Sequence, residues 1–286
     1  MPRPITLARP AVWLIAAAAV SNAVAAGATF FASDLLTGPA VTNAQARGTS
    51  LVMLAIGLPV LVVGAWLASS GSWRGTLFAI GALAYLAYND FLLLFSTPFN
   101  PLFLAYVAAM SLTAFALATT IATTDHEAIA EHARRVPARG IAIYAWVLVV
   151  LNALVWLRTI VPAMFAADPT SFLEDSGVAT NPVFVEDLVF WLPGAALIGA
   201  LLWLRRPLGL TLAGGWLVYG VIEAIGVATD QWFGSIADPG TTQASMDGVA
   251  LFVVVGLIAL VPLFFFFRPE RAPRVAGQPA PTTGPA

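Results

Sequence analysis

Eight stretches of about 20 mostly apolar residues recur along the chain, and they constrain its fold more than any other feature. They lie at 11–32, 51–69, 75–96, 102–123, 141–165, 184–204, 208–230 and 248–267. A helix of that length crosses the hydrocarbon core of a bilayer. Strands that cross a bilayer alternate apolar and polar residues, whereas these stretches are apolar on every face. The sequence therefore predicts an all-α membrane protein with eight transmembrane helices.

The composition agrees with a membrane protein and excludes several classes of function. Charged residues are only 10% of the 286 residues, which is too few to cover the surface of a soluble globule. The chain has no cysteine and no lysine, which excludes thiol nucleophiles, iron–sulfur clusters and Schiff-base chemistry. His126 and His132 share one hydrophilic loop, which excludes a haem held between helices, and their spacing puts them on different faces of a helix. We therefore expect no metal, no cofactor and no nucleic-acid partner.

The arginines predict how the helices are oriented. Eleven lie on one side of the predicted spans: Arg3, Arg9, Arg74, Arg134, Arg135, Arg139, Arg205, Arg206, Arg268, Arg271 and Arg274. Only Arg47 lies on the other side, with Arg158 inside a span near that face, while acidic residues such as Glu186 and Asp187 gather there. By the positive-inside rule both termini are cytoplasmic. Residues 1–25 imitate a cleavable signal peptide, but the repeat described next favours a retained first helix.

An internal duplication is visible when the chain is shifted by 134 residues, which aligns 58–85 with 192–219 without a gap. The identical pairs are Leu58/Leu192, Pro59/Pro193, Leu67/Leu201, Gly75/Gly209, Ala79/Ala213, Gly81/Gly215, Leu83/Leu217 and Tyr85/Tyr219. The first and fifth spans align separately and pair Asn22 with Asn152. We therefore expect two parallel four-helix repeats. A cytoplasmic N-terminus, the first repeat, a cytoplasmic connector, the second repeat and a disordered cytoplasmic tail are expected at 1–10, 11–123, 124–140, 141–267 and 268–286.

Polar side chains inside the predicted spans mark a candidate site, because ionisable residues there are costly and point to function. Helical spacing places Tyr85 and Asn89 on one face of the third span, and Tyr219, Glu223 and Asp230 on one face of the seventh. The full set of candidates is Glu223, Asp90, Asn89, Tyr85, Tyr219, Asn22, Asn152, Arg158 and Asp230. We predict that they line a polar cavity between the repeats, open to the outside, that binds a small solute or an ion.

Each candidate also has a purely structural interpretation. Arg158 can extend to the outer headgroups, and Asp230 can lie in interfacial water. The asparagines of the first and fifth spans can form hydrogen bonds between helices, worth about 0.6 kcal/mol on average. Glu223 and Asp90 lie deeper, so each must pair with Arg158, keep a proton or face water.

Two prolines lie well inside their spans, Pro59 in the second and Pro193 in the sixth. Each removes a backbone hydrogen bond and can kink its helix. The matched pair predicts either a hinge or cavity wall, or a static packing feature.

The turn after the third span carries a resemblance to known proteins. It reads Asn-Pro-Leu-Phe-Leu-Ala-Tyr-Val over 100–107. This stretch resembles one found in a family of uncharacterised bacterial multi-pass integral membrane proteins. The resemblance is short, covers the region around spans two to four, and implies a bacterial cytoplasmic membrane without implying catalytic residues. Physically, Asn100-Pro101 is a tight turn followed by a helix start.

Three classes of function are compatible with these features. The first is a small permease or solute-binding membrane protein that uses the polar cavity. The second is a non-transporting accessory, sensor or structural subunit, whose polar residues contact a partner or hold the bundle together. The third is a lipid-acting enzyme with Asp90 or Glu223 as acid or base, although no nucleophile elbow, HExxH motif or phosphate loop supports it. The lipid bilayer is the one partner common to all three.

The first testable prediction concerns topology. Loops 33–50, 97–101, 166–183 and 231–247 are expected outside, so alkaline phosphatase fused after residue 240 should be active and the same enzyme fused at the C-terminus inactive. If only the C-terminal fusion is active, the orientation is the opposite of the one predicted. An N-terminal sequence of the membrane-inserted protein that begins near Ala26 would contradict the retained first helix.

Overall fold

The computed structural model describes residues 6–173 and 176–268, and every long element in them is a helix. The first half contains α1 (Arg9–Phe31), α2 (Ala40–Val52), the π-helical turn η2 (Met53–Gly57), α3 (Leu58–Ser69), α4 (Trp73–Phe95) and α5 (Phe103–Thr123). The short helix α6 (His126–His132) follows. The second half contains α7 (Ala138–Met164), α8 (Pro182–Glu186), the π-helical turn η4 (Asp187–Trp191), α9 (Leu192–Trp203), α10 (Pro207–Ala237) and α11 (Met246–Phe267). The predicted disordered tail, apart from Arg268, lies outside the described residues.

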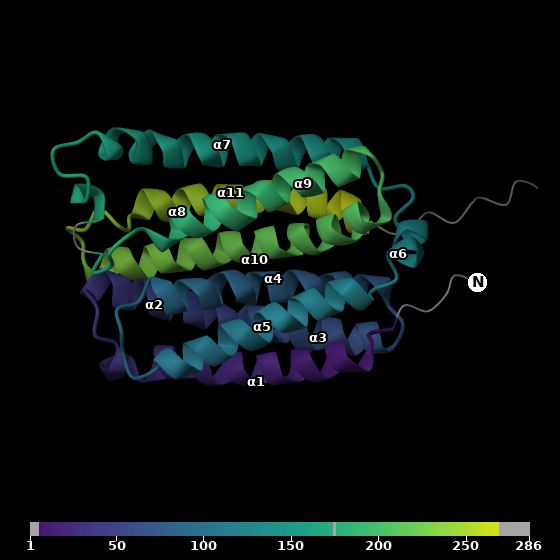
Figure 1. Cartoon of the computed structure of the whole chain (residues 1–286), viewed down its shortest axis with the longest axis horizontal. Coiled ribbons are helices and arrows are strands. Elements are labelled where there is room, and N and C mark those ends of the chain that lie inside the picture. The colour runs from purple at the N-terminus through teal and green to yellow at the C-terminus, as the bar shows by residue number, and fades with distance from the viewer. Residues whose placement is uncertain (1–5, 174–175, 269–286) are drawn as a thin grey trace, which may run out of the picture.

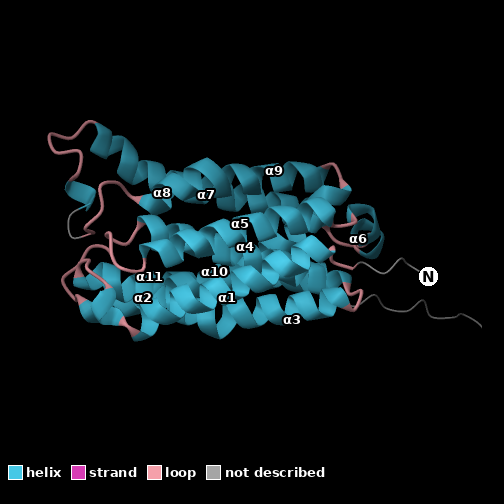
Figure 2. Ribbon diagram, turned by 60° about the horizontal axis from the view of Figure 1, so that its bottom comes forward, coloured by secondary structure: helices cyan, strands magenta, loops and turns pink. Residues whose placement is uncertain are grey.

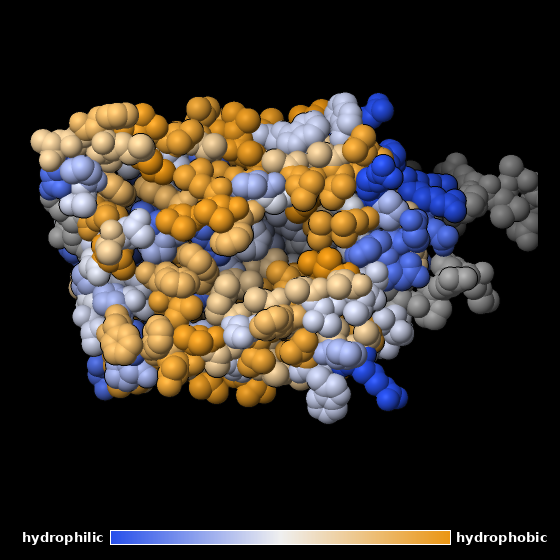
Figure 3. Space-filling view, in the orientation of Figure 1, coloured by the Kyte–Doolittle hydropathy of each residue, from blue (hydrophilic) through white to orange (hydrophobic). Residues whose placement is uncertain are grey.

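Within the described residues, eight helices are long and apolar enough to cross a membrane, which confirms the predicted eight-helix membrane class. Two of them are composite, because α2, η2 and α3 form one continuous helix and α8, η4 and α9 form another. The long helices lie side by side, and α6 caps one end of the bundle (Figures 1 and 2). We call this the connector end and the opposite one the loop end. Hydrophilic residues gather at the connector end, and the helical surface between the two ends is mostly apolar on the face shown in Figure 3.

Two spans extend further toward the loop end than the sequence predicts. The second begins at Ala40, so the predicted loop 33–50 is wrong over most of its length, and the seventh continues to Ala237. The two extensions pack on each other: a Cβ at Gly48 would lie 2.9 Å from the Cα of Asp230. A window average of hydropathy misses such segments because only one face of each helix is buried.

The centre of the bundle is the crossing of α4 and α10, the two most deeply buried spans. A Cβ at Gly81 would lie 2.6 Å from the carbonyl oxygen of Gly215 and 2.5 Å from the Cβ of Val218. A Cβ at Gly215 would lie 2.6 Å from Cγ2 of Ile80. Neither glycine leaves room for a side chain, so the two backbones meet directly.

Matching local structures recur at a spacing of 134 residues. The π-helical turns Met53–Gly57 and Asp187–Trp191 are related by this shift, and each is followed two residues later by Pro59 or Pro193. A proline lacks the N–H that an α-helix needs, and a π turn is a common way to absorb the resulting irregularity.

The hairpins that end the two helices with π turns also match at this spacing. Gly71 has a φ of 88° and Arg205 a φ of 51°, and each residue donates its N–H to the carbonyl three residues earlier, that of Ala68 or Leu202. Glycine adopts such a φ without strain, whereas arginine does so at a cost. The second hairpin therefore keeps the geometry of the first despite a less suitable residue.

The second prediction concerns the central crossing. Gly81→Ala should destabilise the protein by about 1–3 kcal/mol, because the added methyl group overlaps the backbone and a side chain of α10. The control is Gly220→Ala in α10, where nothing lies within 4 Å of the new Cβ. That variant should be neutral or up to about 1 kcal/mol more stable, since alanine favours a helix. Thermal unfolding in detergent measures both, and equal midpoints would contradict a tight crossing.

Candidate functional site

A cavity of about 390 Å³ lies within the second half of the chain, enclosed by α7, η4, α9, α10 and α11. Its polar lining residues are Asn152, Trp156, Asp187, Trp191, Tyr219 and Glu223, together with Tyr144 and Trp216. Its apolar lining includes Leu148, Leu217, Val255 and Ala259. Three of the residues predicted from the sequence therefore lie in one cavity: Glu223, Tyr219 and Asn152.

Glu223 is positioned by the central helix pair. Its Oε2 accepts a hydrogen bond of 2.9 Å from Nδ2 of Asn89, which lies on α4 and is 2% exposed. The same Asn89 nitrogen donates to the backbone oxygen of Tyr85 at 2.9 Å, which holds the amide in place. The carboxyl group of Glu223 thus has a neutral partner on one side and the cavity on the other.

Asp187 is a second carboxyl group at the cavity, and it comes from the π turn η4. Its Oδ2 accepts from Nε1 of Trp156 at 2.8 Å, and its Oδ1 accepts from the hydroxyl of Tyr88 at 3.2 Å. These donors belong to α7 and α4, so two other helices fix the aspartate. Both donors are neutral, and neither balances the charge of a carboxylate. Asn152 of α7 lies nearby, and its Oδ1 is buried without a hydrogen-bond partner in the described residues.

Aromatic rings form one wall beside these carboxyl groups. Trp191 stacks on Tyr219 with ring centroids 4.4 Å apart and an interplanar angle of 11°. Tyr88 packs edge-on against Trp191 at 5.3 Å. The Nε1 of Trp191 donates to Oε1 of Glu186 at 3.0 Å, which orients the indole. Electron-rich aromatic faces next to carboxyl oxygens suit a positively charged or hydrogen-bond-donating ligand.

The first half of the chain is closed at the corresponding place by a buried polar cluster. Asn22 of α1 donates to Thr113 of α5 at 2.8 Å, and Thr113 donates to Oδ2 of Asp90 at 2.7 Å. All three side chains are fully buried. The 134-residue shift maps Asp90 onto Ala224, a lining residue of the cavity. A Cβ at Gly256 of α11 would lie 3.3 Å from the Cβ of Ala224, so small residues stand where the first half has its polar cluster.

The other predicted site residues lie outside the cavity. Asp90 and Asn22 belong to the buried cluster, and Tyr85 is fully buried, with its ring against Gly57 and its hydroxyl unpartnered in the described residues. Asp230 lies against α2, and Arg158 is exposed on α7. The structure thus divides the predicted set into a cavity group and groups that pack between helices or face outward.

Sequence reasoning missed the other half of the site. Asp187 and Trp156 line the cavity, and Glu186 contacts its wall, but the two acids were counted with the outer loops. A signal was present: the two adjacent acids lie within the run that leads into Pro193 and align with apolar Val52 and Met53 under the 134-residue shift. Two acids replacing apolar residues inside a span are costly, which marks them as functional candidates.

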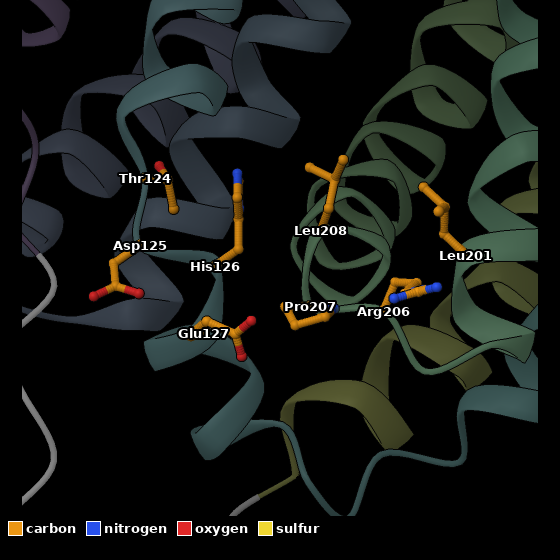
Figure 4. Close-up of a pocket in the computed structure, with 8 residues that line it drawn as sticks. All are labelled: Thr124, Asp125, His126, Glu127, Leu201, Arg206, Pro207 and Leu208. Carbon is orange, nitrogen blue, oxygen red and sulfur yellow. The ribbon is translucent and has the colours of Figure 1, made fainter.

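A second hollow, of about 500 Å³, lies at the connector end between α6 and the hairpin that joins α9 to α10. Figure 4 shows Thr124, Asp125, His126 and Glu127 on one side and Leu201, Arg206, Pro207 and Leu208 on the other. Nδ1 of His126 lies 3.0 Å from the hydroxyl of Thr211 on α10. Burial lowers the pKa of His126, although the neighbouring carboxylates Asp125 and Glu127 act in the opposite direction. This contact docks α6 onto the bundle.

Comparisons with known proteins assign no relatives: no protein-family model, curated protein or solved structure matches the chain. Within the described residues, histidine and acidic side chains form no group of three or more that could hold a metal ion. The geometry of the cavity is therefore the basis for a proposal about function.

The third prediction follows from His126. Its pKa is lower in the folded protein than the usual 6.5, so its contribution to stability is present above that pH and is lost as the pH falls. Between about pH 7.5 and pH 5.5, wild type should lose more thermal stability than His126→Asn, because asparagine keeps a polar contact and does not titrate. Parallel loss in both proteins would show that His126 does not control the docking of α6.

Proposed function

We propose that the protein is a small permease or solute-binding membrane protein whose ligand occupies the cavity formed by α7, η4, α9, α10 and α11. The observation that carries this proposal is the pair of carboxyl groups, Glu223 and Asp187, that line one cavity inside the spans with neutral hydrogen-bond partners. A carboxyl group at that depth is costly, and a packing role does not repay the cost, because an apolar residue would pack at least as well.

The chemistry of the lining favours a cationic ligand. In the part of the chain that the structure describes, Glu223 and Asp187 have no positively charged partner, and a cation would balance their negative charge. The unpartnered Oδ1 of Asn152 accepts a hydrogen bond from the ligand, and the rings of Trp191 and Tyr219 offer a cation–π contact. In the absence of ligand, protons or water take these places, so that ligand binding is coupled to their release.

We further propose that the connector end is cytoplasmic, in a bacterial inner membrane. Several arginines lie at or beside helix ends on this side: Arg9, Arg74, Arg139, Arg206 and Arg268. Two more lie at the same end, where Nη1 of Arg205 is 3.5 Å from the backbone oxygen of Arg134. The positive-inside rule then puts the carboxyl-lined part of the cavity in the outer half of the bilayer.

The two halves are proposed to be parallel repeats related by an axis along the membrane normal. Support comes from the matched π turns, the matched hairpins and the Gly81/Gly215 crossing, all at a spacing of 134 residues. The hydrogen bond from Asn89 to Glu223 also joins positions 134 residues apart, as expected of a contact near the axis. In this proposal the first repeat has become a closed support, and the second has kept or acquired the ligand cavity.

An accessory or structural subunit is the alternative class, and the exposed apolar faces of α7 and α11 favour it in part. Helices that bind a partner present such faces, although lipid covers them equally well. The two classes differ in whether water and cations reach the carboxyl groups.

The fourth prediction tests this difference in the naturally cysteine-free chain. Asn152→Cys should react with a water-soluble methanethiosulfonate reagent, and the cationic form should react at least about tenfold faster than the anionic form, because Glu223 and Asp187 attract it. Leu154→Cys is the matched control on the same helix: its side chain is 59% exposed away from the cavity, and a thiol in lipid is not ionised.

Adding Glu223→Gln to Asn152→Cys should reduce the preference for the cationic reagent several-fold and leave the thermal stability near that of the parent, since a glutamine oxygen still accepts from Asn89. An unreactive Asn152→Cys would favour the accessory class. Strong destabilisation by Glu223→Gln would show that the carboxyl group is structural.

A further inference from the structure

We infer that the ligand of this cavity is a cationic amphiphile, with a positively charged headgroup and a hydrocarbon chain, and that it enters sideways from the bilayer between α7 and α11. The inference rests on the proposed function, since it assigns the ligand class of the same cavity. It goes further because it names a second, apolar part of the ligand and the route of entry.

The polarity of the lining changes along the length of the cavity. Trp156, Asp187 and Asn152 lie toward the loop end, whereas Leu148 and Ala259 lie toward the connector end, where Tyr144 and Trp216 close the cavity with ring centroids 5.8 Å apart. The lining stretch of α7 from residue 144 to residue 156 is about 18 Å long at 1.5 Å per residue. The cavity is therefore elongated along the helices, with its carboxyl groups toward the loop end and, apart from the aromatic pair Tyr144 and Trp216, apolar side chains toward the connector end.

The cavity is open on one side. Three apolar lining residues are more than half exposed, Leu151 at 56%, Val155 at 57% and Leu251 at 57%. They belong to α7 and α11, so the cavity opens between these two helices toward the lipid. In the first half the same place is closed, because Asn22 of α1 bonds directly to Thr113 of α5.

Other kinds of ligand would occupy the apolar part of the cavity less favourably than a hydrocarbon chain. A hydrated ion in the apolar part of the cavity would lose water without gaining polar partners, whereas a hydrocarbon chain is as stable there as in the bilayer. An alkyl chain is narrower than a transmembrane helix, which is about 10 Å across, and an extended chain matches the length of the lining stretch.

The direction of the cavity also matches that of a lipid in the outer leaflet. With the connector end cytoplasmic, the carboxyl groups lie in the outer half of the bilayer and the apolar part of the cavity points toward the midplane. A lipid of the outer leaflet has the same direction, headgroup outward and chain inward. An ammonium group has three N–H donors, and the cavity offers acceptors for them on Glu223, on Asp187 and on the unpartnered Oδ1 of Asn152.

The test uses the full-length protein in nanodiscs of phosphatidylcholine, with radiolabelled hexadecylamine as probe and empty nanodiscs as the blank. Saturable binding of one hexadecylamine per protein is expected. Butylamine, which has the same headgroup and almost no chain, should bind at least about 100-fold more weakly. Hexadecanoic acid, which has the chain and the opposite charge, should not displace the probe.

Two tryptophan variants locate the chain. Leu148→Trp fills the apolar part of the cavity and should weaken hexadecylamine binding at least about tenfold, with Leu148→Phe as a milder second variant if the first does not fold. Leu154→Trp puts the same residue on the lipid-facing side of the same helix and should leave binding unchanged. Glu223→Gln should also weaken hexadecylamine binding, because it removes a carboxyl group that contacts the headgroup.

The outcomes separate this inference from the proposed function. Equal affinity for butylamine and hexadecylamine, both weakened by Glu223→Gln, would overturn the amphiphile and leave a small-cation site. Equal binding of hexadecanoic acid would overturn the cationic headgroup. Equal effects of Leu148→Trp and Leu154→Trp would overturn the placement of the chain. Failure of every amine to bind, together with an unreactive Asn152→Cys, would overturn both proposals.

Discussion

The direct contact of α4 and α10 at Gly81 and Gly215 is the constraint on which the rest of the structure depends. Two helices that meet backbone to backbone have a fixed crossing point, and there is no side chain to rearrange at it. Two turns further along, the contact brings Asn89 to Glu223, so the glycines decide where the central carboxyl group stands. The remaining spans pack around this pair, and their freedom to differ between the two halves creates the asymmetry of the bundle.

That asymmetry distinguishes a half closed by buried polar contacts from a half that contains a cavity. In the first half, Asn22, Asp90 and Thr113 join α1, α4 and α5 through buried hydrogen bonds, and such a network loses stability if one member is removed. In the second half, Ala224 and Gly256 cannot form those bonds, and α7 is held mainly by its contact with α9. The cavity lies beside this helix.

The π turn of the sixth span explains why the second carboxyl group is available. Asp187 begins a π turn that precedes Pro193, and a π turn widens the helix and re-aims the side chains within it. Trp156 and Tyr88 then fix the aspartate from two other helices. The equivalent turn of the first half carries Met53 in this place, which is fully buried and apolar, so the same backbone irregularity supports packing in one half and a polar cavity in the other.

The sequence alone determined the membrane class, the number of spans and the helix that carries Glu223, because these depend on local runs of apolar residues and on one costly carboxyl group within them. It also indicated that the two halves are related, an interpretation that rests on glycine and proline at matched positions, where backbone requirements leave few alternatives. Only the tertiary structure decided which polar residues meet. Asp90 and Glu223 look alike in sequence, yet one is closed in by Asn22 and Thr113 and the other faces a cavity. The helical extensions of α2 and α10, and the contribution of Asp187 and Trp156, also depend on which faces pack together, and burial against a distant segment is a physical property that no local pattern contains.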